Sequence, residues 1–132
     1  MKKIALSSAL LVTLLASGAA LAVDTVICPA TSGSTAAANG VVPANGTAGT
    51  HYMIRPIAPK CSANTNVAGM DGTAGAWYSV GSNSVKGKNS FGGHTNGGAV
   101  AQTAACAVPG GCTASEAVTA KTTANGKAAA ST

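Results

Sequence analysis

Asp71-Gly-Thr-Ala-Gly-Ala-Trp-Tyr78 lies within Val41–Phe91, the stretch that holds most of the large side chains from Val23 onward. Asp-Gly is a strong turn signal, and the aromatic pair that follows it favours β-structure. These eight residues therefore predict a turn that runs directly into a strand. We expect the core of the protein to form around them.

A related segment, Asn45-Gly-Thr-Ala-Gly-Thr-His-Tyr52, occurs 26 residues earlier. The alignment extends over Val41–Lys60 and gives seven identities in 20 positions. It is consistent with one turn-plus-strand unit used twice. It is also consistent with chance, because Gly, Thr and Ala are so common in this chain. Two copies are too few for a solenoid, which needs at least three.

The segments on either side predict short elements joined by loops. We expect a linker over Pro29–Gly40 and a flexible glycine-rich loop over Phe91–Gly98. The expected β-structure is a strand at Val23–Cys28, a tight hairpin over Ser79–Lys86 with its turn at Gly81–Asn83, and a strand of small residues at Ala99–Cys106.

The C-terminal part contains one helix signal. Thr113-Ala-Ser-Glu116 fits a capping box and predicts a short helix at Ala117–Lys121. The threonines that follow are poor helix formers, so we expect residues Thr122–Thr132 to be a flexible low-complexity tail. A single domain would then span residues 23–121.

The N-terminus has the layout of a secretory signal peptide. A cationic start at Lys2-Lys3 precedes an apolar run at Ile4–Ala16 and an A-x-A site at Ala20-Leu21-Ala22. The apolar run is shorter than the roughly 20 residues of a membrane anchor. We expect cleavage after Ala22 and export to the periplasm, the cell surface or the medium, with no transmembrane segment left in the mature protein.

The composition after Ala22 predicts a small β-rich domain with a thin core. Ala, Gly, Ser, Thr and Asn supply 70 of these 110 residues, whereas Val, Ile and Phe supply 14 and Leu none. The large residues that remain are mainly β-formers. The expected fold class is mainly β: a small disulfide-stapled domain with long Gly/Ala/Ser/Thr/Asn-rich loops and a short C-terminal helix.

Four cysteines, Cys28, Cys61, Cys106 and Cys112, indicate disulfides in an exported chain of this size. Three pairings are possible. Val108-Pro109-Gly110-Gly111 has turn chemistry that favours Cys106–Cys112, which leaves Cys28–Cys61. A metal site that uses cysteines with His51 or His94 is the alternative, but no C-x₂-C pair is present. We expect no metal and no cofactor.

Catalytic patterns are scarce. Three acidic residues, spread over positions 24, 71 and 116, do not suggest a pair of catalytic carboxylates. No nucleophile elbow is present, and the glycine-rich segment Gly87–Thr95 has glycine where a phosphate loop has its lysine. We therefore expect neither an enzyme nor a nucleotide-binding protein.

The remaining candidate contacts are cationic or aromatic. Arg55 with Lys60, and Lys86 with Lys88, would form an anion-facing patch if the two related segments lay side by side. His51 and Trp77 occupy matching positions in these segments and are candidate ligand contacts. Anionic glycan and lipopolysaccharide are the candidate ligands of such a patch, and ordinary solvated charge is the alternative.

These observations favour a non-enzymatic, exported structural or surface-interaction protein that associates with itself or with other surface proteins. It could serve as a subunit of an extracellular fibre, a pilus-like structure or a matrix. The alternative is a periplasmic or secreted binding module for a small ligand, a metal or an anionic glycan.

Overall fold

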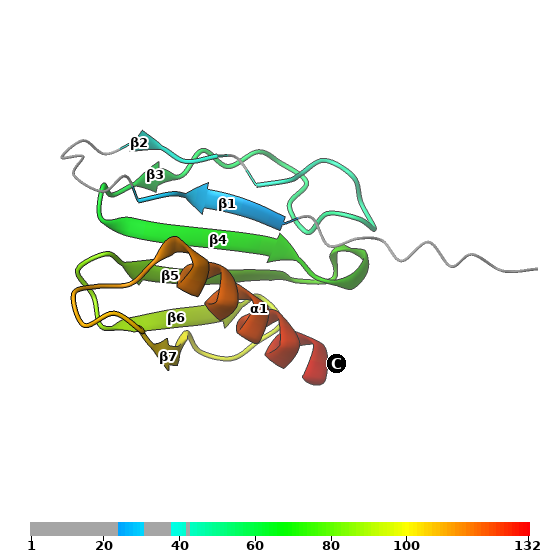
Figure 1. The fold of residues 1–132 in the computed structure, drawn as a ribbon. Helices are drawn as coiled ribbons and strands as arrows, with labels where there is room; N and C mark the ends of the chain where they lie inside the picture. The colour runs from blue at the N-terminus through cyan, green and yellow to red at the C-terminus, as the bar shows by residue number, and fades with distance from the viewer. Residues whose placement is uncertain (1–23, 31–37, 42) are drawn as a thin grey trace, which may run out of the picture.

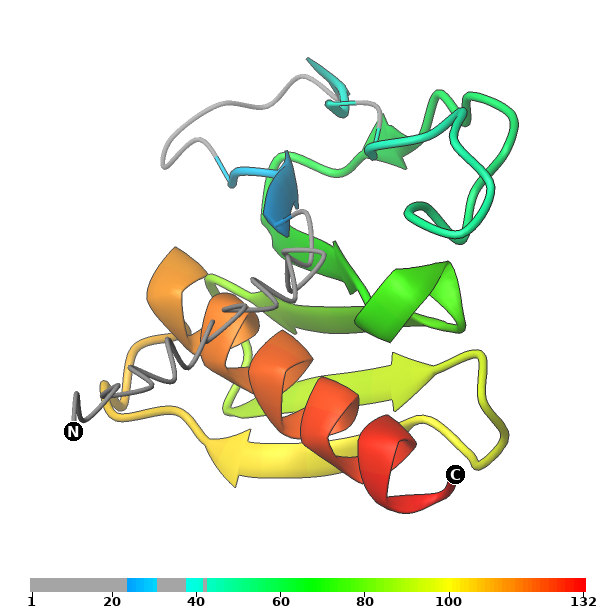
Figure 2. The same cartoon turned by 90° about the vertical axis from the view of Figure 1, so that its right-hand side faces the viewer.

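The computed structural model of the protein describes residues 24–30, 38–41 and 43–132. The expected signal peptide and most of the expected linker lie outside them. The described chain forms one antiparallel sheet of five strands in the order β1-β4-β5-β6-β7, with one C-terminal helix, α1, across one face (Figures 1 and 2). Their bounds are β1 Asp24–Cys28, β4 Thr65–Asp71, β5 Tyr78–Ser84, β6 Asn89–His94, β7 Ala101–Ala105 and α1 Ala114–Ala130.

Smaller elements complete the fold. β2 (Ala38–Asn39) pairs with β3 (Lys60–Cys61) in a separate two-stranded sheet, which lies beyond β1 in both views (Figures 1 and 2). A 3₁₀ turn at Thr73–Gly75 joins β4 to β5. Disulfides join Cys28 to Cys61 and Cys106 to Cys112, which is the pairing that the turn residues favoured. The prediction of a small, mainly β, disulfide-stapled domain is confirmed.

The expected hairpin over Ser79–Lys86 is wrong. Residues Gly81–Asn83 continue β5, where they pair with β4 on one side, and the turn lies at residues 85–88. The expected loop at Phe91–Gly98 is also wrong in its first half, because β6 reaches His94. Glycine and serine favour turns by local preference, but here tertiary packing favours small residues within strands.

That packing occurs between the sheet and α1. The buried side of the helix carries four alanines, Ala117, Ala120, Ala124 and Ala128, together with Lys121. Opposite them, a Cβ added to Gly81 would lie 2.2 Å from the Ala117 carbonyl oxygen, and one on Gly92 would lie 2.8 Å from that of Ala120. The helix backbone therefore rests almost directly on the glycine backbone of β5 and β6.

The helix is longer than the sequence suggested. The capping box at Thr113 and Glu116 is confirmed, but the helix runs to Ala130 and includes most of the expected flexible tail. Ala124 and Ala128 are buried against the sheet. Their contacts compensate for the low helix propensity of Thr122 and Thr123, which face outward.

The opposite face of the sheet carries a second small core beside β1. Ile27, Cys28, Cys61 and Tyr78 form it, and Met53, Val67 and Val80 pack at its margin. The Cys28–Cys61 disulfide links β1 to β3 within this cluster. The long segment between β2 and β3 is therefore fastened to the sheet by a covalent bond as well as by apolar contact.

The two related segments share a turn but not a strand. Thr50 N donates to Thr47 O, and Ala76 N donates to Thr73 O at the matching positions. Gly49 and Gly75, which also match, both have positive φ. Only the second copy leads into a strand, so the expected strand after Tyr52 is wrong. The copies touch, since Tyr52 N donates to the buried Asp71 carboxylate.

Within the described ranges, no helix is both long and apolar enough to cross a membrane.

Candidate functional site

The two edge strands of the sheet, β1 and β7, have different neighbours. Beyond β1, the β1 carbonyl of Ile27 accepts a hydrogen bond from Val41 N, and the disulfide to Cys61 holds the β2–β3 ribbon nearby. At the other side, β7 pairs with β6 alone and forms the edge (Figure 1). Its side chains are uncharged and, apart from Gln102, small, and all except half-buried Thr103 are exposed. The β7 edge, residues Ala101–Ala105, has no backbone partner on its outer side among the described residues.

Apolar side chains lie beside this edge on the sheet face opposite α1. Phe91 is 41% exposed and Val100 is 74% exposed. They line a shallow groove of about 220 Å³ together with Tyr78, Val80 and Gly93. We call this surface the back groove. Large apolar side chains that remain this exposed near an unpaired strand are a feature of association surfaces.

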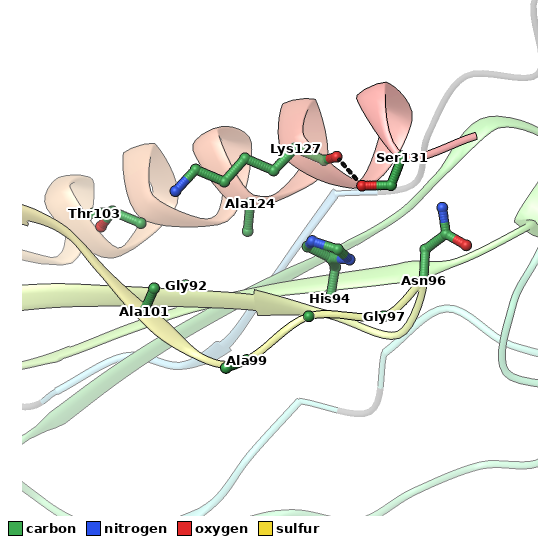
Figure 3. Close-up of a pocket in the computed structure, with 11 residues that line it drawn as sticks. Gly92, His94, Asn96, Gly97, Ala99, Ala101, Thr103, Ala124, Lys127 and Ser131 are labelled. Carbon is green, nitrogen blue, oxygen red and sulfur yellow. Dashed lines mark hydrogen bonds between the residues drawn. The ribbon is translucent and has the colours of Figure 1, made fainter.

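A second hollow lies on the helix side of the sheet and has a volume of about 460 Å³. It is enclosed by the last turns of α1, the end of β6 and the loop that leads to β7 (Figure 3). Gly92, Ala101 and Ala124 leave the space open because they have little or no side chain. We call it the helix-end pocket.

The polar groups of the helix-end pocket come from distant parts of the chain. His94 ends β6, Asn96 follows it in the loop, and Lys127 projects from α1 (Figure 3). Asn96 Nδ2 donates to the Ala128 carbonyl oxygen over 2.9 Å and ties the loop to the helix. The His94 Nδ1 atom is buried and has no hydrogen-bond partner. The pocket is lined by an imidazole ring and an ammonium, and the Asn96 hydrogen bond holds its loop against α1.

Buried polar side chains support the helix on the sheet. Asn83 bonds to Asn66, Ser90 and the Thr113 carbonyl, where the helix begins. Near the other end, Asn125 Oδ1 accepts from Trp77 Nε1 over 2.7 Å and from Ser79 Oγ over 3.3 Å. These bonds fix where α1 lies along the sheet, since each buried group would be costly to leave without its partner.

The candidate residues proposed from the sequence lie in different places. Trp77 is 5% exposed and bonded to Asn125, so it packs inside the domain. His51 is half-buried in the turn of the first related segment, and its backbone lies against Gly75. Both pairs of basic residues are exposed: Arg55 and Lys60 lie before and within β3, and Lys86 and Lys88 lie in the β5–β6 turn.

The described contacts do not join these two basic pairs into one patch. Lys60 donates to Asn39 across the β2–β3 ribbon, and Lys86 is held through its backbone N, which donates to Ser84. The anion-facing patch of Arg55, Lys60, Lys86 and Lys88 stays a prediction.

Cys106, Cys112 and Glu116 bring ligand-type atoms within 4.8 Å of one another. The two sulfurs are joined in a disulfide, and the carboxylate accepts hydrogen bonds from the backbone N–H groups of Ala107 and Thr113. These bonds lower the pKa of Glu116. The Glu116 carboxylate therefore caps the N-terminus of α1. The two sulfurs could bind a metal only after reduction of the disulfide.

The comparisons with known proteins return no relative: no family model, no curated protein and no solved structure matches this chain.

Sequence reasoning missed the helix-end pocket. The sequence predicts His94 in a flexible glycine-rich loop and Lys127 in a flexible tail 33 residues further along. No short-range pattern joins them. The signal that could have indicated the pocket is the alanine spacing over Ala117–Ala128, which gives a helix one small face to lay on a glycine-rich sheet.

Proposed function

We propose that this is an exported structural or surface-interaction protein that associates through its β7 edge and back groove, with other copies of itself in the first place. The observation that carries the proposal is the asymmetry of the sheet. The outer side of β1 accepts a backbone hydrogen bond from Val41 N and is linked by a disulfide to the β2–β3 ribbon. The outer side of β7 has no backbone partner among the described residues and lies beside exposed Phe91 and Val100.

Natural proteins commonly protect an open edge with lysine, proline or a bulge. β7 has neither lysine nor proline. It does carry a bulge, because the register shifts between Ser90 and Phe91 and leaves Thr103 without a cross-strand partner. Pairing with an incoming strand would therefore be interrupted at Thr103. The apolar side chains of the back groove would have to contribute much of the contact.

The two disulfides suit such a role outside the cytoplasm. They are compatible with an oxidising compartment, and the expected signal peptide would deliver the chain there. A subunit exposed to the medium benefits from covalent links, because its apolar core is small. The assembly could belong to a fibre, a pilus-like structure or a matrix.

The test measures the association state of the purified protein over a wide concentration range. Analytical ultracentrifugation gives the mass of the particles, and negative-stain microscopy shows whether they form longer assemblies. The wild type is expected to form dimers or longer assemblies. A double variant, Gln102→Lys with Ala104→Lys, should remain monomeric because it places like charges on the edge. Ala129→Lys adds a charge to an exposed position of α1 and serves as the matched control.

A monomer at all concentrations would contradict self-association. Assemblies that are unaffected by the two edge lysines would place the interface elsewhere. The binding-module alternative has its own structural basis in the helix-end pocket, which is considered next.

A further inference from the structure

The helix-end pocket combines an open volume with the Lys127 ammonium and the His94 imidazole. Its volume of about 460 Å³ falls within the range of small-molecule sites. Figure 3 shows the His94 ring rising from β6 between sheet and helix, while the Lys127 side chain runs along α1 above Ala124. No acidic residue is among the side chains that line the pocket.

Every acidic side chain of the described chain is engaged elsewhere. Asp24 pairs with Lys121, Asp71 accepts from Tyr52 N, and Glu116 accepts from the backbone at the start of α1. The sequence holds three acidic residues in all. Among the described residues no ion pair engages Lys127, so an anion that enters the pocket would meet its ammonium with no acidic side chain in the lining.

The number of donors suggests the class of ligand. Phosphate and sulfate groups are usually held by several charged or backbone donors, often at a helix N-terminus. The helix-end pocket lies at the C-terminal end of α1, where the helix dipole opposes any anion and opposes a dianion more strongly. A single carboxylate carries one negative charge, which the Lys127 ammonium can offset, and an imidazole N–H could add one hydrogen bond. Asn96, Thr103 and Ser131 add polar groups for the rest of a hydroxyl-bearing ligand.

We propose that the helix-end pocket binds a small carboxylate-bearing ligand of the size of one acidic sugar, with Lys127 and His94 contacting the carboxylate. This inference does not require assembly through the β7 edge, because Lys127 lies on α1 and Phe91 lies on the other face of the sheet, although Ala101 and Thr103 of the β7 edge also line the pocket. Failure of one proposal therefore leaves the other standing.

In the test, the protein is titrated with glucuronate. Its backbone amide signals and the side-chain signals of His94 are followed by NMR. Glucose is the neutral control, and inorganic phosphate tests the alternative anion. Saturable shifts centred on His94, Asn96 and Lys127 are expected with glucuronate and not with glucose. Lys127→Gln and His94→Gln should each weaken binding at least tenfold while near-ultraviolet circular dichroism stays unchanged.

Thr122→Gln provides the control. It places the same amide side chain at an exposed position of α1 that does not line the pocket, and it should bind like the wild type. Three results would overturn the proposal: no saturable shift with glucuronate, equal shifts with glucose, or equal loss of affinity in Thr122→Gln and Lys127→Gln. Saturation by phosphate with no response to glucuronate would also overturn the assignment to a carboxylate.

Discussion

The Lys121 ammonium donates to the Asp24 carboxylate at the start of β1, 97 residues earlier in the chain. Lys121 lies on the buried side of α1 and is 1% exposed. The partners are unequal, because the Asp24 side chain is 56% exposed. The bond fastens the first strand of the sheet to the last helix. It also explains how a lysine can be buried among the alanines of α1.

Substitutions in this pair should have unequal effects. Asp24→Asn leaves a buried ammonium without its counter-ion. We expect a loss of roughly 2 kcal/mol in the free energy of unfolding, below the 3–5 of a fully buried pair because Asp24 faces solvent. Lys121→Met removes the charge and keeps the volume, so it should cost less than about 1 kcal/mol. Urea denaturation measures both, and an Asp24→Asn variant as stable as Lys121→Met would contradict this account.

Close approach of helix and sheet depends on Gly81. A methyl group there would meet the Ala117 carbonyl oxygen and Lys121 N at 2.2 Å, so the helix must move away. Gly81→Ala should destabilise the protein by roughly 1–3 kcal/mol or more. Gly126→Ala is the matched control, because nothing lies within 4 Å of its added methyl group. It should stabilise α1 by roughly 0.5–1 kcal/mol. Thermal denaturation should move in opposite directions for the two variants.

The two disulfides should differ in their contribution to stability. Loop closure predicts roughly 3.8 kcal/mol for Cys28–Cys61 and roughly 2.4 kcal/mol for Cys106–Cys112. The first also belongs to the small core with Ile27 and Tyr78. Replacing Cys28 and Cys61 with serine should therefore lower the denaturation midpoint more than replacing the other pair. Mass spectrometry of the wild type should find no free thiols. Equal midpoints, or four titratable thiols, would contradict the prediction.

Alkaline pH should destabilise the fold through Tyr78. Burial, with the negative charges of Asp71 and Asp24, raises its pKa from 10.0 to about 12. The folded state therefore favours the neutral phenol. The neutral Tyr78 phenol therefore contributes roughly 1–2 kcal/mol to the free energy of unfolding after screening by solvent. This contribution is complete below pH 10 and is lost as the pH rises through 12. Tyr78→Phe should abolish this loss at little cost, because the buried hydroxyl has no hydrogen-bond partner. Denaturation between pH 8 and 12 compares the two proteins.

At low pH the start of α1 should weaken. Hydrogen bonds from the backbone of Thr113 and Ala107 lower the pKa of Glu116, so the folded state favours the carboxylate. That stabilisation is present above the unfolded-state pKa and disappears as the pH falls through the folded-state value. Glu116→Gln should lower the melting temperature at pH 7 and leave it nearly unchanged at pH 2. A constant difference between the two proteins would point to packing instead of charge.

Much of the local structure could be predicted from the sequence. The capping box at Thr113 and Glu116, the strand of small residues before Cys106 and both disulfides required only short-range patterns or cysteine spacing. The turn after Asp71 was also predicted, since Asp-Gly and a glycine with positive φ specify it locally. These features depend on backbone preferences that act within a few residues.

Other features depend on distant partners. Gly81, Ser82 and Asn83 look like a turn in isolation, but they form the middle of β5 because α1 needs a surface without side chains at Gly81. Thr122 and Thr123 predict little helix, yet helix persists there because Ala124 and Ala128 bury their methyl groups against the sheet. The same docking places Lys127 and His94 in the walls of one pocket, the helix-end pocket.

The sequence by itself therefore determined the β-rich class, the thin core, the cysteine framework and the start of the helix, because composition and local turn chemistry control these. Tertiary structure decided the length of α1, the course of β5 and β6, the burial of Lys121 and the position of both candidate surfaces. The physical reason lies in the glycine and alanine content. Small residues have weak local preferences, so their conformation follows from the close contact they permit between segments far apart in the chain.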